Sequence, residues 1–428
     1  MDGLAAQSDR SNQLALPMTE TARRESRDLT PALWIVLALL SISLLINYVD
    51  RSSISTAAPL IASEFHLSAT QLGNLFSAFS YTYAIFLVLS GWLADRYNVN
   101  WILAIGFALW SVSTLLTGFA DSVATFFVLR LLLGMGESVA YPCYSRIVVR
   151  QFPEHRRGLA NSVIAIGMPG GLAVGTFAGA ILMGRFGWRP FFIFLGAGTM
   201  LWLIPWIIRM PREQVLQQSS IQKPPSVGKI LAQRSFWGTC AGLFTLNFVL
   251  YFMINWLPLY LVRERGFAMD RVATVGFVYL TAAVLSPLFG WLSDYMIVMG
   301  VTPSKSRKSI MAGGLALSAL SLLACVLVES HQAALILLLF AGVGFGLSNS
   351  QTFTISQTLA GRNASGRWTG FQNFAGNIAG ILGPKIAGPL IDRTGNFFWA
   401  FALTTIVGLL GVLIWVFVVG PLQEINWE

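Results

Sequence analysis

Charged residues are scarce in this sequence. Only 11% of the 428 residues are charged and 55% are hydrophobic, whereas charged residues make up about a quarter of a typical soluble domain. The mean hydropathy of +0.65 agrees with this imbalance. Such a composition excludes a soluble globular protein and indicates a chain whose main solvent is lipid.

Cysteine and histidine are rare as well. The three cysteines lie within apolar segments and show neither a disulfide framework nor metal-ligand spacing: Cys143, Cys240 and Cys325. The three histidines are expected in loops: His66, His155 and His331. The sequence also lacks a glycine-rich phosphate-binding loop with a lysine. We therefore expect no enzymatic activity, no metal site and no cofactor, and an ATP-driven pump is excluded.

The net charge of +9 has a topological explanation. The basic residues are scattered singly between apolar runs, so a nucleic-acid partner is not expected. If the N-terminus is cytoplasmic, eighteen Lys and Arg residues fall on the cytoplasmic side against six outside. This bias predicts that both termini are cytoplasmic and that the number of spans is even. Short outer loops without a glycosylation cluster favour a bacterial inner membrane.

Apolar runs of about 20 residues, each long enough to cross a membrane, recur through the chain. They lie at roughly 32–62, 72–94, 101–119, 123–149, 158–184, 189–208, 236–262, 270–296, 309–328, 332–357, 367–390 and 396–419. The fold class predicted is therefore an all-α membrane protein of twelve transmembrane helices. The first run is longer than a bare span and contains Asp50, Arg51 and Pro59, so we expect it to line a polar cavity.

A repeated phrase suggests that the twelve helices arose by duplication. Gly-Trp-Leu-Ala-Asp at 91–95 returns as Gly-Trp-Leu-Ser-Asp at 290–294. We expect two pseudo-symmetric six-helix bundles, at 31–208 and 235–420, joined by a polar cytoplasmic linker at 209–234. Cytoplasmic tails are expected at 1–30 and 421–428. Glycines at 167, 171, 175 and 179 predict a helix face that a neighbouring backbone can approach closely.

Ionisable residues inside the spans are few, and they cost at least ~2.5 kcal/mol each, so they are kept mainly where they act. They are Asp50, Arg51, Arg130, Glu137, Arg146 and Lys385. For Arg146 we favour snorkelling or a structural pair with a loop. Lys385 is equally compatible with a gating ion pair and a structural role.

Four of these charges suggest a coupling mechanism. Arg130 and Glu137 share a helix face about 10.5 Å apart, which is too far for a direct salt bridge. Each therefore needs a partner elsewhere, and Asp50 and Arg51 are the obvious candidates. The four charges sum to zero when both carboxylates are ionised and to +2 when both are protonated, so protonation would attract an anion. The alternative is a buried ion-pair cluster that only fixes helix packing.

The second half supplies neutral polar side chains. They are Asn247, Tyr251 and Asn255 on one helix face, Asn349, Gln351 and Gln357 on another helix, and Asn373 and Asn377 on a third. Amides bind hydroxyls and carboxylates, which suits a polyhydroxylated substrate. Each amide alone can equally make an interhelical hydrogen bond. Tyr48, Tyr81 and Tyr83 could donate from the first half.

Several motifs together resemble one transporter family. They are Asn-Tyr-Val-Asp-Arg at 47–51, the stretch from Arg130 through Gly134, Gly136, Glu137 and Pro142 to Arg146, Phe-Pro-Glu-His-Arg-Arg at 152–157, and Trp-Leu-Pro-Leu-Tyr-Leu at 256–261. The chain resembles the anion:cation symporter family of the major facilitator superfamily over residues 30–420. That family includes bacterial galactonate, glucarate and hexuronate symporters.

The resemblance implies roles for particular residues. Asp50 and Glu137 would carry protons, Arg51 would bind the substrate carboxylate, and Arg130 would interact with the carboxylates during the cycle. The resemblance also implies a substrate site lined by Tyr48, Tyr83 and Asn373.

The sequence departs from the family pattern at three places. The loop at 95–100 lacks the usual glycine and second basic residue, so gating is assigned to Asp95 with Arg146 or Arg150. Met168 stands where galactonate-type carriers have glutamine, and Phe353 where they have tryptophan. A less hydroxylated or differently shaped acid is therefore compatible with this sequence.

These observations predict a monomeric secondary transporter that imports a small organic anion, such as a hexonate, hexarate or hexuronate, with protons. The alternative is a proton-antiporting exporter of drugs or metabolites. An exporter of lipophilic cations would show acidic residues without facing arginines, which is the opposite of Arg51 and Arg130. A membrane sensor would need an appended soluble domain, and none is recognisable.

Overall fold

The computed structural model describes residues 30–427, apart from residue 153 and residues 211–224. Within that part of the chain all regular structure is helical, as expected where lipid cannot satisfy backbone polar groups. The N-terminal half holds α2 (Pro31–Glu64), α3 (Ala69–Arg96), α4 (Val99–Thr117), α5 (Val123–Glu137), α6 (Ala140–Gln151), α7 (Glu154–Ala165), α8 (Gly167–Phe186), α9 (Trp188–Met200) and α10 (Leu203–Arg209).

The C-terminal half begins with the short helix α11 (Val227–Leu231), which lies within the described part of the predicted linker. It continues with α12 (Arg234–Arg263), the 3-10 helix η1 (Met269–Thr274), α13 (Val275–Val298), α14 (Pro303–Leu327), α15 (His331–Thr394), α16 (Phe398–Leu413) and the π-helix η2 (Ile414–Val418). Residue 155 lies within α7 and residue 331 begins α15, so the expectation that all three histidines lie in loops was wrong for these two.

Twelve helical segments in the described chain are long and apolar enough to span a membrane, which confirms the predicted number. The first is one continuous helix of 34 residues, α2. Five spans combine two consecutive helices, namely α5 with α6, α7 with α8, α9 with α10, η1 with α13, and α16 with η2. Conversely, α15 contains two spans that meet at Gly361. There φ is 65° and ψ is −178°, a conformation that glycine adopts most easily and that ends one helix before the next begins.

Polar side chains cap the N-termini of several of these helices, next to the predicted loops. The Ser68 hydroxyl accepts a hydrogen bond from the Gln71 backbone amide at 3.2 Å, and the Gln71 Oε1 accepts one from the Ser68 backbone amide at 2.9 Å, forming a capping box at α3. The hydroxyls of Ser122 and Thr302 cap α5 and α14 by accepting from the backbone amides of Thr125 and Lys305. Serine and threonine between apolar runs therefore mark where spans start.

The glycine face of α8 packs directly against the backbone of α2. A Cβ on Gly167 would lie 2.7 Å from the Ser41 carbonyl oxygen, and one on Gly175 would lie 2.8 Å from the Val49 Cα. These distances are shorter than any ordinary carbon contact, so only glycine permits this approach. The close approach predicted for this glycine face is confirmed, and it holds the central part of α2 in place.

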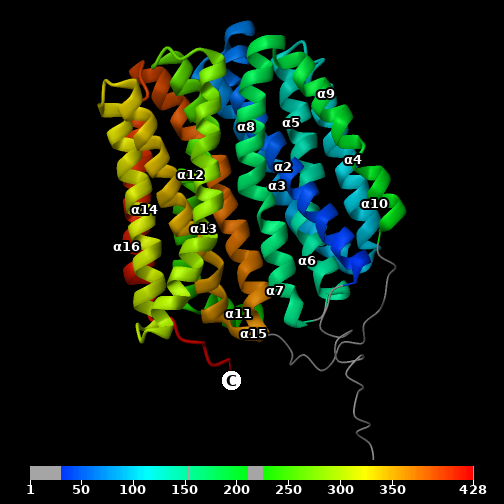
Figure 1. The fold of residues 1–428 in the computed structure, drawn as a ribbon, viewed down its shortest axis with the longest axis vertical. Helices are drawn as coiled ribbons and strands as arrows, with labels where there is room; N and C mark the ends of the chain where they lie inside the picture. Colours follow the sequence, from blue (N-terminus) through cyan, green and yellow to red (C-terminus); the bar gives the residue numbers. More distant parts are fainter. Residues whose placement is uncertain (1–29, 153, 211–224, 428) are drawn as a thin grey trace, which may run out of the picture.

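The twelve spans form two six-helix bundles. In Figure 1 the helices α2–α10 lie on the right and α11–α16 on the left, and α2 begins at the lower end, where the chain also ends. We call this lower end the terminal end and the upper one the far end. The bundles meet through α2 with α12, α3 with α15, and α8 with α13. The predicted fold class is therefore confirmed.

Candidate functional site

A cavity lies between the two bundles and is lined by both. Its N-terminal wall consists of Tyr48, Arg51, Phe76, Phe79, Ser80, Tyr83, Arg130, Tyr141 and Met168. Its C-terminal wall consists of Leu243, Asn247, Leu250, Tyr251, Ile254, Asn255, Asn349, Phe353, Asn373 and Asn377. The charged lining residues, Arg51 and Arg130, both belong to the first wall, whereas the opposite wall is made of amides, one phenol and apolar side chains.

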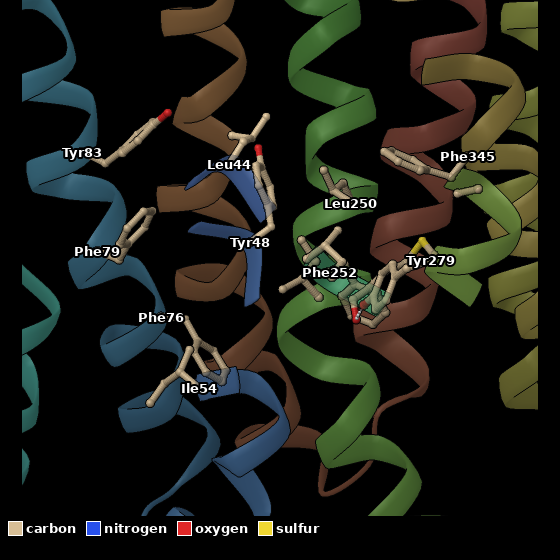
Figure 2. Packing of buried hydrophobic residues seen from close by; sticks show 14 of the residues in the cluster. Leu44, Tyr48, Ile54, Phe76, Phe79, Tyr83, Leu250, Phe252, Tyr279 and Phe345 are labelled. Carbon is tan, nitrogen blue, oxygen red and sulfur yellow. Dashed lines mark hydrogen bonds between the residues drawn. The ribbon is translucent and has the colours of Figure 1, made fainter. Parts of the chain in front are cut away.

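Aromatic rings surround the guanidinium of Arg51. Its central carbon lies 4.8 Å from the ring centre of Tyr48, 4.7 Å from that of Phe79 and 4.6 Å from that of Tyr83. Figure 2 shows Tyr48 on α2, Phe79 and Tyr83 on α3, and Leu250 on α12. Ring faces attract a cation, so this cage holds the guanidinium in one place at the cavity wall.

Glu137 lies behind this wall and pairs with Arg51. The Arg51 Nε donates to Glu137 Oε2 at 2.8 Å, and the Glu137 side chain is completely buried. Glu137 does not line the cavity. Arg51 Nη2 and Glu137 Oε1 have no hydrogen-bond partner among the described residues. One guanidinium therefore connects the cavity to a buried carboxylate and keeps a free donor.

Asp50 is the second carboxylate behind the wall. It is 2% exposed, neither oxygen has a hydrogen-bond partner in the described chain, and it does not line the cavity. Glu137 and Arg130 are the charged groups that act on it electrostatically. The predicted quartet is therefore arranged in two layers, with the arginines facing the cavity and the carboxylates behind them.

Arg130 shares one aromatic ring with Arg51. Its guanidinium carbon lies 5.1 Å from the ring centre of Phe79, and the residue is 6% exposed. Its Nε has no hydrogen-bond partner among the described residues. Because both guanidinium groups lie about 5 Å from the same ring, they lie close together on this wall.

The C-terminal wall carries a hydrogen-bonded chain. The Tyr251 hydroxyl donates to Asn377 Oδ1 at 2.8 Å, and Asn377 Nδ2 donates to Asn373 Oδ1 at 3.1 Å. Asn247 and Asn349 also line the cavity, and Asn255 Oδ1 accepts a hydrogen bond from Ser55 at 3.2 Å. This wall offers neutral donors and acceptors.

Two predicted amides do not belong to this wall. Gln351 is buried and donates to the Phe289 carbonyl and the Ser350 hydroxyl, which satisfies its amide within the bundle. Gln357 lies one and a half turns further along α15 and is exposed. The cavity is shorter along α15 than the sequence pattern suggested, because Asn349 and Phe353 are its lining residues on this span.

Three lining residues of α3 were missed by the sequence analysis: Phe76, Phe79 and Ser80. With Tyr83 they occupy positions i, i+3, i+4 and i+7, which is one face of a helix. That spacing could have identified them. The same geometry turns Tyr81 away from this cavity, so it is not a lining residue.

The residues assigned to gating lie at the terminal end. The side chain of Asp95 lies outside the described residues, and Arg146 is half-buried on α6 and engaged with neighbours. The repeated phrase has its second acidic residue at Asp294, which pairs with Arg307 of α14 at 3.5 Å. Arg307 also donates to the Thr358 hydroxyl of α15 at 2.5 Å. Lys385 is exposed on α15.

Hydrogen bonds join the two bundles at the far end. The two carboxylate oxygens of Asp392 accept from the backbone amides of Ala69 at 2.8 Å and Thr70 at 2.7 Å, at the start of α3. A Cβ on Gly388 would lie 3.0 Å from the Thr70 Cα, so the two helices meet backbone to backbone. A carboxylate at a helix N-terminus is stabilised by the orphan amides and the helix dipole.

Replacing Asp392 with alanine should open the far end. Loss of these two charge-assisted bonds removes up to ~2 kcal/mol from this conformation, which shifts the equilibrium by up to about thirtyfold. A cysteine introduced at Ser80, which lines the cavity, should then react several times faster with an impermeant maleimide applied from the far side. The native cysteines are buried. Asp121→Ala, a change at an exposed residue before α5, is the matched control. Equal labelling rates with and without Asp392→Ala would show that the Asp392 hydrogen bonds do not hold the far end together.

Twelve spans in two bundles, with a polar cavity between them, form the architecture of a membrane transporter. Comparison with known protein families identifies the family. The Major Facilitator Superfamily model matches residues 40–384 and 280–426, and this chain belongs to that superfamily. It is therefore a transporter and not an enzyme, as the sequence predicted.

The similar proteins include transporters of sugar acids. The chain is 31% identical to the hexuronate transporter of Bacillus subtilis strain 168 over 389 residues, covering 86% of this chain and 90% of that protein. It is 26% identical to the probable galactarate/D-glucarate transporter of Escherichia coli strain K12 over 429 residues, covering 92% and 96%. A bacterial homologue of the human lysosomal transporter Spinster has the same fold, with a TM-score of 0.78, 19% identity and coverage of 92% and 98%.

Proposed function

We propose that this protein imports a small organic anion, of the sugar-acid class, in symport with protons. The observation that carries the proposal is the layered quartet, with two arginines on the cavity wall and two buried carboxylates behind them. The sugar-acid transporters among its relatives support the substrate class. The amide wall supports a hydroxylated body on the substrate.

The arginines would bind the substrate carboxylate. Arg51 has a free buried donor, Nη2, and an aromatic cage that fixes its position. A carboxylate in the cavity would satisfy that donor and would compete with Glu137 for the guanidinium. Tyr48, Tyr83 and Asn373, all lining residues, would complete the substrate site.

The carboxylates would carry the protons. Glu137 and Asp50 are both buried away from the cavity, so ionising them depends on the neighbouring arginines. When a proton neutralises Glu137, Arg51 is released for the substrate anion. When the proton leaves, Glu137 reclaims Arg51 and the anion is displaced. Binding of the proton and of the anion therefore favour each other, which is the thermodynamic requirement for symport.

The bundles would supply the conformational change. We assign residues 31–208 and 235–420 to two bodies that rock about the cavity, with residues 209–234 as their linker. We propose an inner-membrane location with both termini cytoplasmic, which makes the far end the outer face. Asp392 then belongs to the outer gate and Asp95 with Arg146 to the inner one. Residues 1–29 and most of the linker lie outside the described residues.

Uptake into proteoliposomes tests the proposal. Purified protein should accumulate labelled hexonate or hexuronate when the outside is acidic, and a protonophore should abolish accumulation without stopping exchange. Protein-free liposomes and liposomes without a pH gradient are the controls. Uptake that does not respond to the gradient would refute proton coupling. Failure to transport any acid in a panel of sugar acids and aromatic acids would refute the substrate class.

A further inference from the structure

Both cationic side chains that line the cavity lie close together on one wall. Arg51 and Arg130 flank the same Phe79 ring on the N-terminal wall. The C-terminal wall contains no lysine, arginine or histidine among its lining residues. A substrate can therefore place one carboxylate against guanidinium groups, while its other end meets amides and Tyr251.

The amide wall suits hydroxyl groups better than a second carboxylate. A hydroxyl both donates and accepts, and it can use the oxygen and the nitrogen of an amide alike. An ionised carboxylate only accepts, and burying it without a cation carries a large desolvation cost. Some polar groups of the wall also already pair with one another, because Tyr251 donates to Asn377 and Asn377 donates to Asn373.

We infer that this transporter selects monocarboxylic sugar acids, hexonates or hexuronates, over the dicarboxylic hexarates. The inference rests on the proposed function and narrows its substrate class. It separates two chemistries that occur among the relatives, because a hexuronate has one carboxylate and galactarate and glucarate have two. The position of the arginines decides the preference, since both of them serve the same carboxylate end.

A matched pair of ligands tests this selectivity. A hexonate and the hexarate of the same configuration differ only at carbon 6, which is a hydroxymethyl group in one and a carboxylate in the other. In proteoliposomes with an inward proton gradient, the hexonate should be taken up about tenfold faster at equal subsaturating concentration, because the hexarate would bury an unpaired charge. Each unlabelled acid should inhibit labelled hexonate uptake in the same order.

A cation placed on the amide wall should reverse the preference. Asn349 lines the cavity from α15, so Asn349→Lys adds an ammonium group there, and Asn349→Met is the uncharged control of similar length. The lysine variant should raise the ratio of hexarate to hexonate uptake several-fold, and the methionine variant should not. Size-exclusion profiles show whether each variant is folded, and the wild-type ratio decides the question even if the lysine variant is not.

The outcomes separate this inference from the proposed function. Hexonate preference in the wild type, with a shift toward hexarate in the lysine variant, supports it. Equal or faster hexarate uptake by the wild type overturns the selectivity but leaves organic-acid transport intact. A folded lysine variant with an unchanged ratio overturns the assignment of the amide wall. Absence of uptake for every acid overturns the proposed function and the selectivity together.

Discussion

Arg51→Lys should abolish substrate uptake although it keeps the positive charge. The Arg51 guanidinium uses Nε for Glu137 at 2.8 Å and still has Nη2 free. A lysine has one nitrogen on a flexible chain, so it cannot hold Glu137 and present a second fixed donor to the cavity. It would also lose the stacking against Tyr48, Phe79 and Tyr83. Disrupting one partner of a buried charge pair costs several kcal/mol, so we expect uptake to fall by about a hundredfold or more.

The chain contains a matched control for this substitution. Arg189 pairs with Glu64 at 2.8 Å, the same separation as the Arg51 pair, but both side chains are partly exposed and neither lines the cavity. Arg189→Lys should leave uptake within about twofold of wild type, since exposed pairs contribute little. Initial uptake rates and ligand-induced thermal shifts measure both variants. Near-normal uptake by Arg51→Lys would show that the anion is bound elsewhere.

The fold could be predicted from the sequence because it depends on patterns of residue type that repeat along the chain. Span length and composition are set by membrane thickness, so the twelve apolar runs correspond to twelve membrane-spanning helical segments. The boundaries at Ser68 and Ser122 follow from capping chemistry. The glycine spacing on α8 predicted a close helix contact, although it could not name α2 as the neighbour.

The arrangement of the two arginines on the cavity wall and the two carboxylates behind them could not be predicted from the sequence in the same way. Helical spacing placed Arg130 and Glu137 on one face and excluded their mutual pairing, but the choice between Asp50 and Arg51 as partners depends on how α2 is rotated. Contacts with α8 set that rotation, and the tertiary structure turns Arg51 toward Glu137. Asp392 was missed because its partners are backbone amides, which carry no residue-specific signal in a sequence.

The division of the quartet between the cavity wall and the interior is the feature that most distinguishes this site from a structural ion-pair cluster. A cluster that only fixes helix packing would keep all its charges away from the cavity, whereas here both arginines line the cavity and both carboxylates do not. Here Asp50, the Glu137 Oε1 and the Arg51 Nη2 are all buried without a partner in the described chain. Groups left in this state are available to a proton or an anion.

Glu137→Gln should separate proton coupling from substrate binding. Glutamine has the shape of a protonated glutamate, and its oxygen can still accept from the Arg51 Nε. The variant is therefore fixed in the state that favours the anion, because Arg51 no longer faces a negative charge. Accumulation driven by a pH gradient should fall by about tenfold or more, while exchange of labelled for unlabelled acid across the membrane continues in part.

Comparison with Glu64→Gln makes this result specific. Glu64 also accepts from an arginine, but it lies outside the cavity and is partly exposed, so its replacement should change neither accumulation nor exchange. Gradient-driven accumulation that survives in Glu137→Gln would remove Glu137 from the proton path and leave Asp50 as the remaining carboxylate of the quartet. Loss of both accumulation and exchange in a folded variant would instead assign Glu137 to holding Arg51 in place. Only the separation of the two activities identifies a proton carrier, because a residue that merely fixes packing cannot affect one without the other.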